Sequence, residues 1–172
     1  EGKRLEKLSY TLMDLLSLSG KDIQLQPVSI ASVVKQLRQY YDAVSITDRL
    51  CFHCASCTVY ALEELLFSAL RNLIDNAIKY SGGKPDILVY TQEKTGAYLI
   101  GVQDHGIGIS KEAQKKVFKR FYRVPSGNLH NVKGFGLGLS YVKSIVELHG
   151  GSVKLTSRKN KGTLVEIEFK KE

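Results

Sequence analysis

The sequence predicts an α+β fold in which helices pack on one face of a mixed β-sheet. Two observations carry this prediction. Long amphipathic helices, with apolar residues at spacings of three and four, are interspersed with short β-prone runs. Most of those runs are joined by short turns, which favours hairpins. With 172 residues, 43% hydrophobic and 24% charged, the chain can form one packed domain plus a short extension.

The N-terminal residues are expected to precede this domain. Leu5, Leu8, Leu12 and Leu15 recur at spacings of three, four and three, and Gly20 follows. This pattern predicts the tail of a bundle or coiled-coil helix. A short helix docked on its own domain is the alternative. Residues 21–27 are interpreted as a linker, so the predicted domain covers residues 28–172. Because the chain opens without Met, we interpret it as part of a longer protein.

Four helices are expected within the domain. Ser29 is placed to cap the first, whose inner face carries Val33, Val34 and Leu37. The second is expected over residues 59–80, where Ser-Gly-Gly and then Pro85 end it. The others are expected over residues 111–122 and 137–149.

Strands are expected where β-prone residues cluster between turn signals. These runs cover residues 44–46, 50–52, 86–91, 98–102, 152–156 and 163–169. Residues 125–132, which contain Pro125, Gly127 and two Asn residues, are interpreted as a mobile loop.

The net charge of +8 is unevenly distributed. Seven basic residues and one acidic residue, Glu112, lie between Lys111 and Lys133. We interpret Lys111, Lys115 and Lys116 as a solvated helix face. Because this stretch separates two glycine-containing motifs, phosphates of a small ligand are a nearer target than nucleic acid. No apolar run reaches the roughly 18 residues that a membrane span requires.

Cys51, Cys54 and Cys57 form a C-x2-C-x2-C run around His53. A metal or iron–sulfur site is one reading, but such sites usually need a fourth ligand, and no further Cys follows. We favour a structural or incidental role. The odd number of Cys fits a reducing compartment.

Polar residues on the long predicted helix suggest a site. Asn72 and Asn76 lie one turn apart, and Lys79 or Tyr80 lies one turn further. Carboxamide oxygens suit Mg²⁺, and a Lys can hold a phosphate as a point charge. A polar outer face with no such role is the alternative.

Two glycine-containing motifs follow. In DHGIG, at 104–108, Asp104 comes directly after a predicted strand and could accept a hydrogen bond from an adenine amino group. In GFGLGL, at 134–139, three glycines precede a helix whose N-terminal N–H groups could face an anion. The second motif lacks the G-K-[ST] ending of a P-loop and the preceding strand of a Rossmann fold.

NLIDNAIKY at 72–80, DHGIG, VFKRFYR at 117–123 and GFGLGL occur in this order. Together they resemble the N, G1, F and G2 boxes of the catalytic, ATP-binding domain of bacterial sensor histidine kinases. Gyrase, the MutL repair ATPases and a heat-shock chaperone belong to the same superfamily. The resemblance covers about residues 27–169. It implies a two-layer α/β sandwich of the Bergerat type, with ATP and Mg²⁺ as cofactors.

The resemblance also implies roles for individual residues. Asn76 would coordinate Mg²⁺, and Asp104 would bind the adenine amino group, with Thr163 nearby. Arg123 and Lys133 would belong to a lid over the nucleotide, anchored by Phe118 and Phe121. The remaining implied site residues line the phosphates or shape the base pocket: Asn72, Lys79, Tyr80, Gly106, Gly108, Gly134, Phe135, Gly136, Leu137, Gly138 and Leu139.

The hydrolysing members of the superfamily carry a Glu as general base where this chain has Asn72. An Asn cannot take a proton at neutral pH, which favours phosphoryl transfer over hydrolysis. A histidine kinase modifies a His that is followed by an acidic residue, and none of the four His residues here is. The acceptor would therefore lie in a dimerisation and phosphoacceptor domain, whose last helix residues 1–20 resemble.

The resemblance thus implies a cytoplasmic domain, from a bacterial inner-membrane sensor that forms a homodimer and passes phosphate to a response regulator. This chain alone is not expected to phosphorylate itself, and no nucleic-acid partner is expected. A regulatory nucleotide-binding module that no longer transfers phosphate, or a superfamily ATPase, is the alternative.

Overall fold

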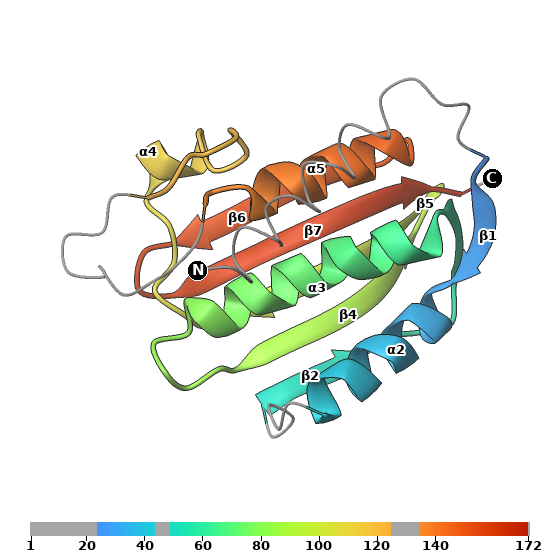
Figure 1. Cartoon of the computed structure of the whole chain (residues 1–172), viewed down its shortest axis with the longest axis horizontal. Helices are drawn as coiled ribbons and strands as arrows, with labels where there is room; N and C mark the ends of the chain where they lie inside the picture. Colours follow the sequence, from blue (N-terminus) through green and yellow to red (C-terminus); the bar gives the residue numbers. More distant parts are fainter. Residues whose placement is uncertain (1–23, 44–48, 125–134, 172) are drawn as a thin grey trace.

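The computed structural model describes residues 24–43, 49–124 and 135–171. Three helices, α2 (Ile30–Asp42), α3 (Glu63–Lys79) and α5 (Gly138–Leu148), cover one face of a five-stranded sheet (Figure 1). The predicted α+β sandwich is therefore confirmed. The predicted bundle helix, the strand at 44–46 and the loop at 125–132 lie outside the described residues. Among the described residues, no helix combines the length and apolar character needed to cross a bilayer.

The sheet is mixed, as predicted, and its strands run in the order β2-β4-β5-β7-β6. Only β2 and β4 pair in parallel within it, and the other neighbours are antiparallel. The strand bounds are β2 (Leu50–His53), β4 (Ile87–Lys94), β5 (Ala97–Asp104), β6 (Ser152–Arg158) and β7 (Gly162–Lys170). All five contain or overlap a predicted strand.

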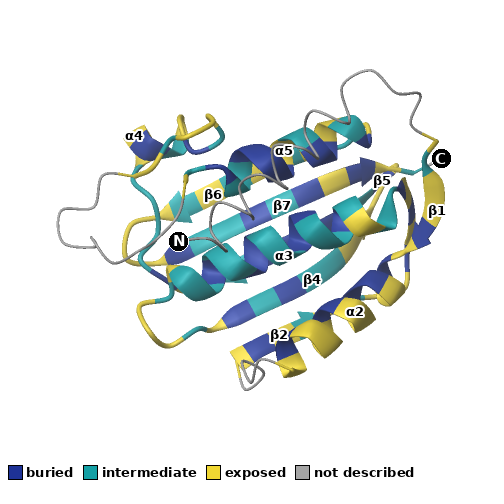
Figure 2. Ribbon diagram, viewed as in Figure 1, coloured by how far each residue is buried: buried dark blue, intermediate teal, exposed yellow. Residues whose placement is uncertain are grey.

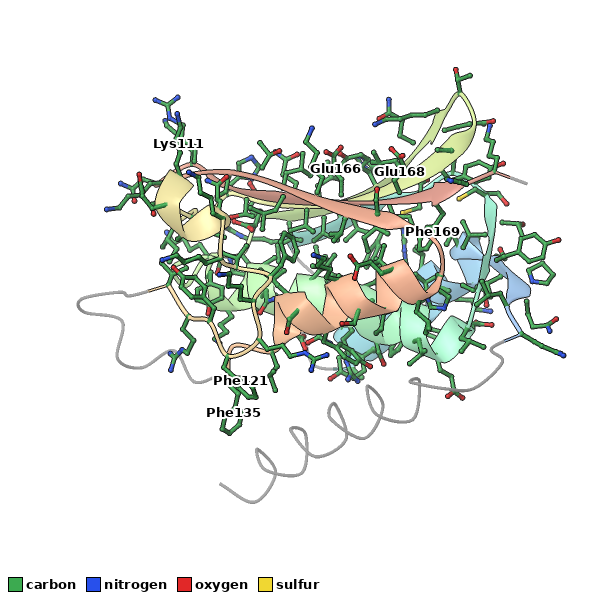
Figure 3. The ribbon with its side chains drawn as sticks, turned by 90° about the horizontal axis from the view of Figure 1, so that it is seen from above. Lys111, Phe121, Phe135, Glu166, Glu168 and Phe169 are labelled. Carbon is green, nitrogen blue, oxygen red and sulfur yellow. The ribbon has the colours of Figure 1, made fainter. Side chains whose placement is uncertain are left out.

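One row of apolar side chains crosses the sheet on its helix-covered face. Val89 lies opposite Val102, which lies opposite Val165, and all three are buried. Figure 2 shows buried stretches on α3, on α5 and on the strands of the sheet that these helices cover. Figure 3 shows Glu166 and Glu168 on the other face of the sheet, away from the helices, with Phe169 on the helix side. The alternation along β7 thus places its apolar side chains in the core.

A second, two-stranded sheet corrects the predicted start of the long helix. Thr58–Ala61 forms β3, which pairs antiparallel with β1 (Gln26–Ser29). The helix therefore begins at Glu63, because β-branched and aromatic residues at 58–60 favour a strand. Strand β1 also includes the last two residues of the predicted linker, Gln26 and Pro27. Ser29 occupies the N-cap position of α2, but its side chain makes no capping bond. Instead, the Ile30 N–H donates to the Cys57 carbonyl at 2.9 Å.

The helix predicted over residues 111–122 is much shorter. Helix α4 covers only Lys111–Gln114, and the chain continues in turns. The N–H groups of Lys116, Lys119 and Tyr122 each donate to the carbonyl three residues earlier. Lys111, Lys115 and Lys119 would follow one another at i and i+4 on a continuous helix, and like charges at this spacing repel. Phe121 has a left-handed backbone, with φ of 62°, which is incompatible with a continuing helix.

Helix α3 carries the predicted Asn pair, and two buried side chains fix its position. At its middle, the Tyr41 hydroxyl of α2 donates to Asp75 Oδ1 at 2.8 Å. At its start, the Leu62 N–H donates to His149 Nε2 at 2.9 Å, while His149 Nδ1 lies 2.8 Å from the Ile145 carbonyl. An imidazole that accepts at Nε2 and donates at Nδ1 is neutral. His149 therefore links the end of α5 to the start of α3.

His149 is expected to make the stability of the domain depend on pH. Burial lowers the pKa of the imidazole, and its bond to Ile145 only partly opposes this shift. Because the unfolded chain then binds the proton first, unfolding becomes easier as the pH falls below about 6.5. Urea unfolding of the parent and of His149→Gln between pH 7.5 and 5.5 should show a shallower pH dependence in the variant.

The matched control is His53→Gln, because His53 is exposed and lies at the end of β2. This control should keep the pH dependence of the parent. An identical slope for the parent and for His149→Gln would show that His149 does not stay neutral in the folded state.

Candidate nucleotide-binding site

The predicted site residues that the structure describes gather at one end of the sheet. Figure 1 shows the end of α3, the loop after β5, the start of α5 and the β6–β7 turn at this end. These segments come from four separate parts of the sequence. The antiparallel pairing of β5 with β7 places Asp104 directly opposite Thr163. The fold therefore brings three of the four sequence motifs together here, and the fourth, residues 117–123, lies against Gly136 just before α5.

The Asn pair on α3 faces the start of α5. A Cβ added to Gly138 would lie 3.3 Å from Asn76 Nδ2 and 3.6 Å from Asn72 Oδ1. The Asn72 amide nitrogen donates to the Ser68 carbonyl at 3.0 Å, one turn earlier on the same helix. This bond sets the orientation of the Asn72 carboxamide and directs its oxygen away from the α3 backbone. Glycine at 138 thus gives α5 room beside both carboxamides.

Asp104, at the end of β5, is a half-buried carboxylate held by backbone donors. Its Oδ1 accepts from the Gly106 N–H at 2.8 Å and from the Thr163 N–H at 3.2 Å. Burial raises the pKa of Asp104, and these two N–H groups oppose the rise. Both bonds use the same oxygen, so they also fix how the carboxylate is oriented. A buried acceptor in a fixed orientation is suited to recognise one donor group.

The DHGIG loop is held closely against its neighbours. The Ile107 N–H donates to the Tyr80 carbonyl at 3.1 Å, and the Asn160 N–H donates to the Ile107 carbonyl at 2.7 Å. A Cβ at Gly106 would lie 2.2 Å from the Tyr80 oxygen, and one at Gly108 would lie 2.0 Å from the Arg158 oxygen. Both glycines are therefore required for the loop to fit between α3 and the β6–β7 turn.

Lys79 and Tyr80 end α3 at this same end of the sheet. Lys79 Nζ lies 5.0 Å from the centre of the Tyr80 ring, within the range of a cation–π contact. Burial raises the pKa of the Tyr80 phenol, and the positive charge of Arg123 opposes this rise. Arg123 is thus near enough to Tyr80 to act on its ionisation through space. Two cations from different segments therefore lie around one tyrosine.

The described part of the GFGLGL motif, residues 135–139, leads into α5. Leu137 occupies the N-cap position and is buried, and the Ser140 hydroxyl donates to its carbonyl at 2.9 Å. Gly136 has φ of 73°, and a Cβ there would lie 2.6 Å from the Tyr122 oxygen. Leu139 packs partly buried against the core. Lys133 and Gly134 lie outside the described residues, so their predicted roles stay predictions.

The F-box aromatics differ from one another. Phe118 is partly buried, whereas Phe121 is 63% exposed. Phe121 is therefore not held by burial here. The lid that it was expected to anchor lies mostly outside the described residues, so that role stays a prediction. Figure 3 shows Phe121 near the exposed Phe135, beyond the start of α5.

The three cysteines differ in exposure and do not form a single site. Cys51 is exposed, Cys54 is half-buried and Cys57 is buried. Burial raises the pKa of Cys54 to about 11 and also raises that of Cys57. The thiols of Cys54 and Cys57 are therefore protonated and weakly reactive at neutral pH. Within residues 24–43, 49–124 and 135–171, no three His, Cys, Asp or Glu side chains lie together as metal ligands.

Sequence reasoning missed the supporting role of Ser157 on β6. Its hydroxyl accepts from the Ile109 N–H at 2.8 Å and lies 2.9 Å from Thr163 Oγ1. Gln114 of α4 donates to the Ser157 carbonyl at 2.8 Å. A lone Ser within an alternating strand gives no signal of such contacts. Ser110, by contrast, precedes α4 as a helix cap and accepts from the Ala113 N–H at 3.3 Å.

Comparisons with known proteins identify the family. Residues 61–172 match the family described as histidine kinase-, DNA gyrase B- and HSP90-like ATPase, and the chain belongs to that family. The sensor protein RprX of Bacteroides fragilis is 49% identical over 107 residues, covering 61% of this chain and 21% of RprX. The sensor-like histidine kinase SenX3 of Mycolicibacterium smegmatis is 32% identical over 168 residues, covering 95% of this chain and 44% of SenX3.

Solved structures agree with this assignment. The mycobacterial sensor histidine kinase MprB has a TM-score of 0.66 at 27% identity, over 85% of this chain and 97% of that one. Full-length ShkA in complex with AMPPNP has a TM-score of 0.77 at 23% identity, over 98% of this chain and 36% of that one. The chain is thus the ATPase-family domain found in two-component sensor kinases. It spans less than half the length of RprX or SenX3.

The close packing of the DHGIG loop gives a stability prediction. Gly108 and Gly96 both have positive φ, of 63° and 76°, but only Gly108 has backbone within reach of an added Cβ. Gly108→Ala should therefore lower the free energy of unfolding by about 1–3 kcal/mol more than Gly96→Ala. Urea unfolding of both variants measures the difference, and equal losses would show that the loop is not closely packed.

Proposed function

We propose that this domain binds Mg²⁺-ATP and presents the γ-phosphate for transfer to a His on a dimerisation and phosphoacceptor domain. One observation carries the proposal. The oriented carboxylate of Asp104 and the carboxamides of Asn72 and Asn76 lie at the same end of the sheet. The first suits the amino group of a base, and the others suit the cation that accompanies phosphates.

At the adenine end, Asp104 would accept a hydrogen bond from the exocyclic amino group. Its Oδ1 is engaged by Gly106 and Thr163, so Oδ2 would be the recognising atom. A burial-raised pKa means that the ionised carboxylate is poorly solvated, and a donor from the ligand would compensate for this. Gly106 and Gly108 shape the loop under the base, and Thr163 closes it from β7.

At the phosphate end, the residues present fit a magnesium ion. Asn76 would ligate it, with Asn72 beside it and Lys79, Tyr80 and Arg123 on the phosphate side. When bound, the ion would neutralise phosphate charge. The start of α5, residues 135–139, would offer backbone N–H groups to the phosphates. Asn72 offers no base for water, which supports transfer over hydrolysis.

The named relatives support a proposal for the phosphoacceptor and the downstream partner. Relatives of this chain are sensor kinases more than twice its length. We therefore infer that the whole protein is a homodimeric sensor at a bacterial inner membrane, with this domain in the cytoplasm. Its phosphoryl group would pass from the acceptor His to a response regulator.

Removing the charge of Asp104 should weaken nucleotide binding without lowering the free energy of unfolding. An Asn at 104 keeps one oxygen for the Gly106 and Thr163 N–H groups. It replaces Oδ2 with an NH2 group, which cannot accept a hydrogen bond from the amino group of the base. Asp104→Asn should lower affinity for a non-hydrolysable ATP analogue by about tenfold or more, as expected for a lost charged hydrogen bond. Calorimetric titration in the presence of Mg²⁺ measures this.

Two further readouts make the test specific. The unfolding free energy of Asp104→Asn should equal or exceed that of the parent, because a folded-state pKa above the unfolded value means that ionisation opposes folding. Asp86→Asn is the control, because exposed Asp86 contacts His105 on the same loop at 3.2 Å. Unchanged affinity in Asp104→Asn, or an equal loss in Asp86→Asn, would contradict the assignment.

Phosphoryl transfer is tested by adding a separate acceptor-bundle fragment and γ-labelled ATP. Acid-labile label should appear on the bundle and depend on Asn76, while the domain alone should release little phosphate. Tight ATP binding without transfer would favour the regulatory-module reading. Steady release of phosphate without a bundle would favour a superfamily ATPase.

A further inference from the structure

The exposed positive charge of this domain is concentrated at the nucleotide end. Residues 105–124 contain six basic side chains between Lys111 and Arg123 and one acidic side chain, Glu112. The β6–β7 turn adds three more, Arg158, Lys159 and Lys161, without an acidic partner in residues 157–162. All nine basic side chains are exposed. The surplus in these two segments equals the net charge of +8 of the whole chain.

The two basic segments are packed together. Gln114 of α4 donates to the Ser157 carbonyl on β6 at 2.8 Å, immediately before the basic turn. The Asn160 N–H in that turn donates to the Ile107 carbonyl at 2.7 Å. Figure 1 shows α4 and the β6–β7 turn at the same end of the sheet, and Figure 3 shows Lys111 pointing outward from it. The charges therefore form one basic rim, defined as residues 111–123 and 158–161.

The rim adjoins the proposed adenine pocket, and Arg123 is the one basic residue of the rim that is also placed on the phosphate side of the site. Thr163, just after the basic turn, donates to Asp104 Oδ1 at 3.2 Å. The acidic side chains of β7, Glu166 and Glu168, lie on the open face of the sheet, away from α3 and α5 (Figure 3). Fixed charge of one sign beside a pocket raises the local concentration of an oppositely charged ligand and its association rate.

We propose that the basic rim steers the polyanionic nucleotide into this pocket and sets its association rate. This inference rests on the proposed nucleotide-binding function and adds a kinetic role for residues outside the binding contacts. Charge outside the pocket acts on the approaching ligand, so it should change association far more than dissociation. Lys159 and Lys161 are the residues of choice, because they are exposed turn residues with no assigned contact to the nucleotide.

The test compares two charge reversals of equal size. Lys159→Glu with Lys161→Glu alters the rim, and Lys94→Glu with Lys170→Glu alters the far end of the sheet. Lys94 and Lys170 are exposed and both lie opposite Ala97, at the β4–β5 turn. The length of β7, from Gly162 to Lys170, separates the two pairs by about 26 Å at ~3.3 Å per residue. This exceeds the screening length of about 8–10 Å at physiological salt.

Stopped-flow mixing with a fluorescent, non-hydrolysable ATP analogue and Mg²⁺ gives both rate constants. At low salt the rim variant should associate about tenfold more slowly than the parent, with dissociation nearly unchanged. The far-end variant should associate at nearly the parent rate. At about 0.5 M salt the rate constants of all three proteins should converge, because the charges are screened.

The outcomes are distinguishable. Equal slowing in both variants would show that net charge, not its placement, matters, and it would overturn the proposal. Unchanged association in the rim variant would overturn it as well, while leaving nucleotide binding intact. No binding by the parent at any salt concentration would instead overturn the proposed function itself.

Discussion

Asp104 Oδ1 accepts hydrogen bonds from the N–H groups of both Gly106 and Thr163, and the candidate site is organised around this atom. Gly106 belongs to the loop that follows β5, and Thr163 belongs to the start of β7. The same loop bonds the end of α3 through Tyr80 and the β6–β7 turn through Asn160. These hydrogen bonds therefore constrain the loop, the start of β7 and the end of α3 together. The oxygen that joins these segments also orients the carboxylate that would recognise the base.

Binding and stability oppose each other at this position. Burial raises the pKa of Asp104 because it disfavours the ionised carboxylate in the folded protein. The ionised form is nevertheless the one that would accept a hydrogen bond from the base. The close packing of Gly106 and Gly108 against neighbouring backbone instead favours both folding and binding, because it fixes the loop in place. His149 adds a second fixed point, where a neutral imidazole joins α5 to α3 far from the loop in sequence. Both helices that flank the site are thereby held at a defined separation.

Much of this arrangement could be predicted from the sequence. Apolar spacing located α3 and α5, β-prone runs between turn signals located the strands of the main sheet, and three short motifs located Asn72, Asn76, Asp104 and Gly138. The misses have physical causes. Thr58–Ala61 became a strand because β1 was available as a partner, which is a tertiary contact. The helix predicted over residues 111–122 ends at Gln114, because basic side chains would repeat at helical spacing beyond it. The supports from Ser157 and His149 depend on contacts between distant segments, and single residues in the sequence do not reveal such contacts.

The central claim is that Asp104 reads an adenine base within a pocket for nucleotide phosphates. Calorimetric titration of this domain with non-hydrolysable analogues of ATP and GTP, each with Mg²⁺, tests it most directly. The two analogues share their phosphates but differ at the base, where adenine presents an amino donor and guanine a carbonyl acceptor at the corresponding position. The account predicts that the ATP analogue binds at least about tenfold more tightly, since a misplaced acceptor would face a buried carboxylate. Equal affinity for the two analogues would contradict it.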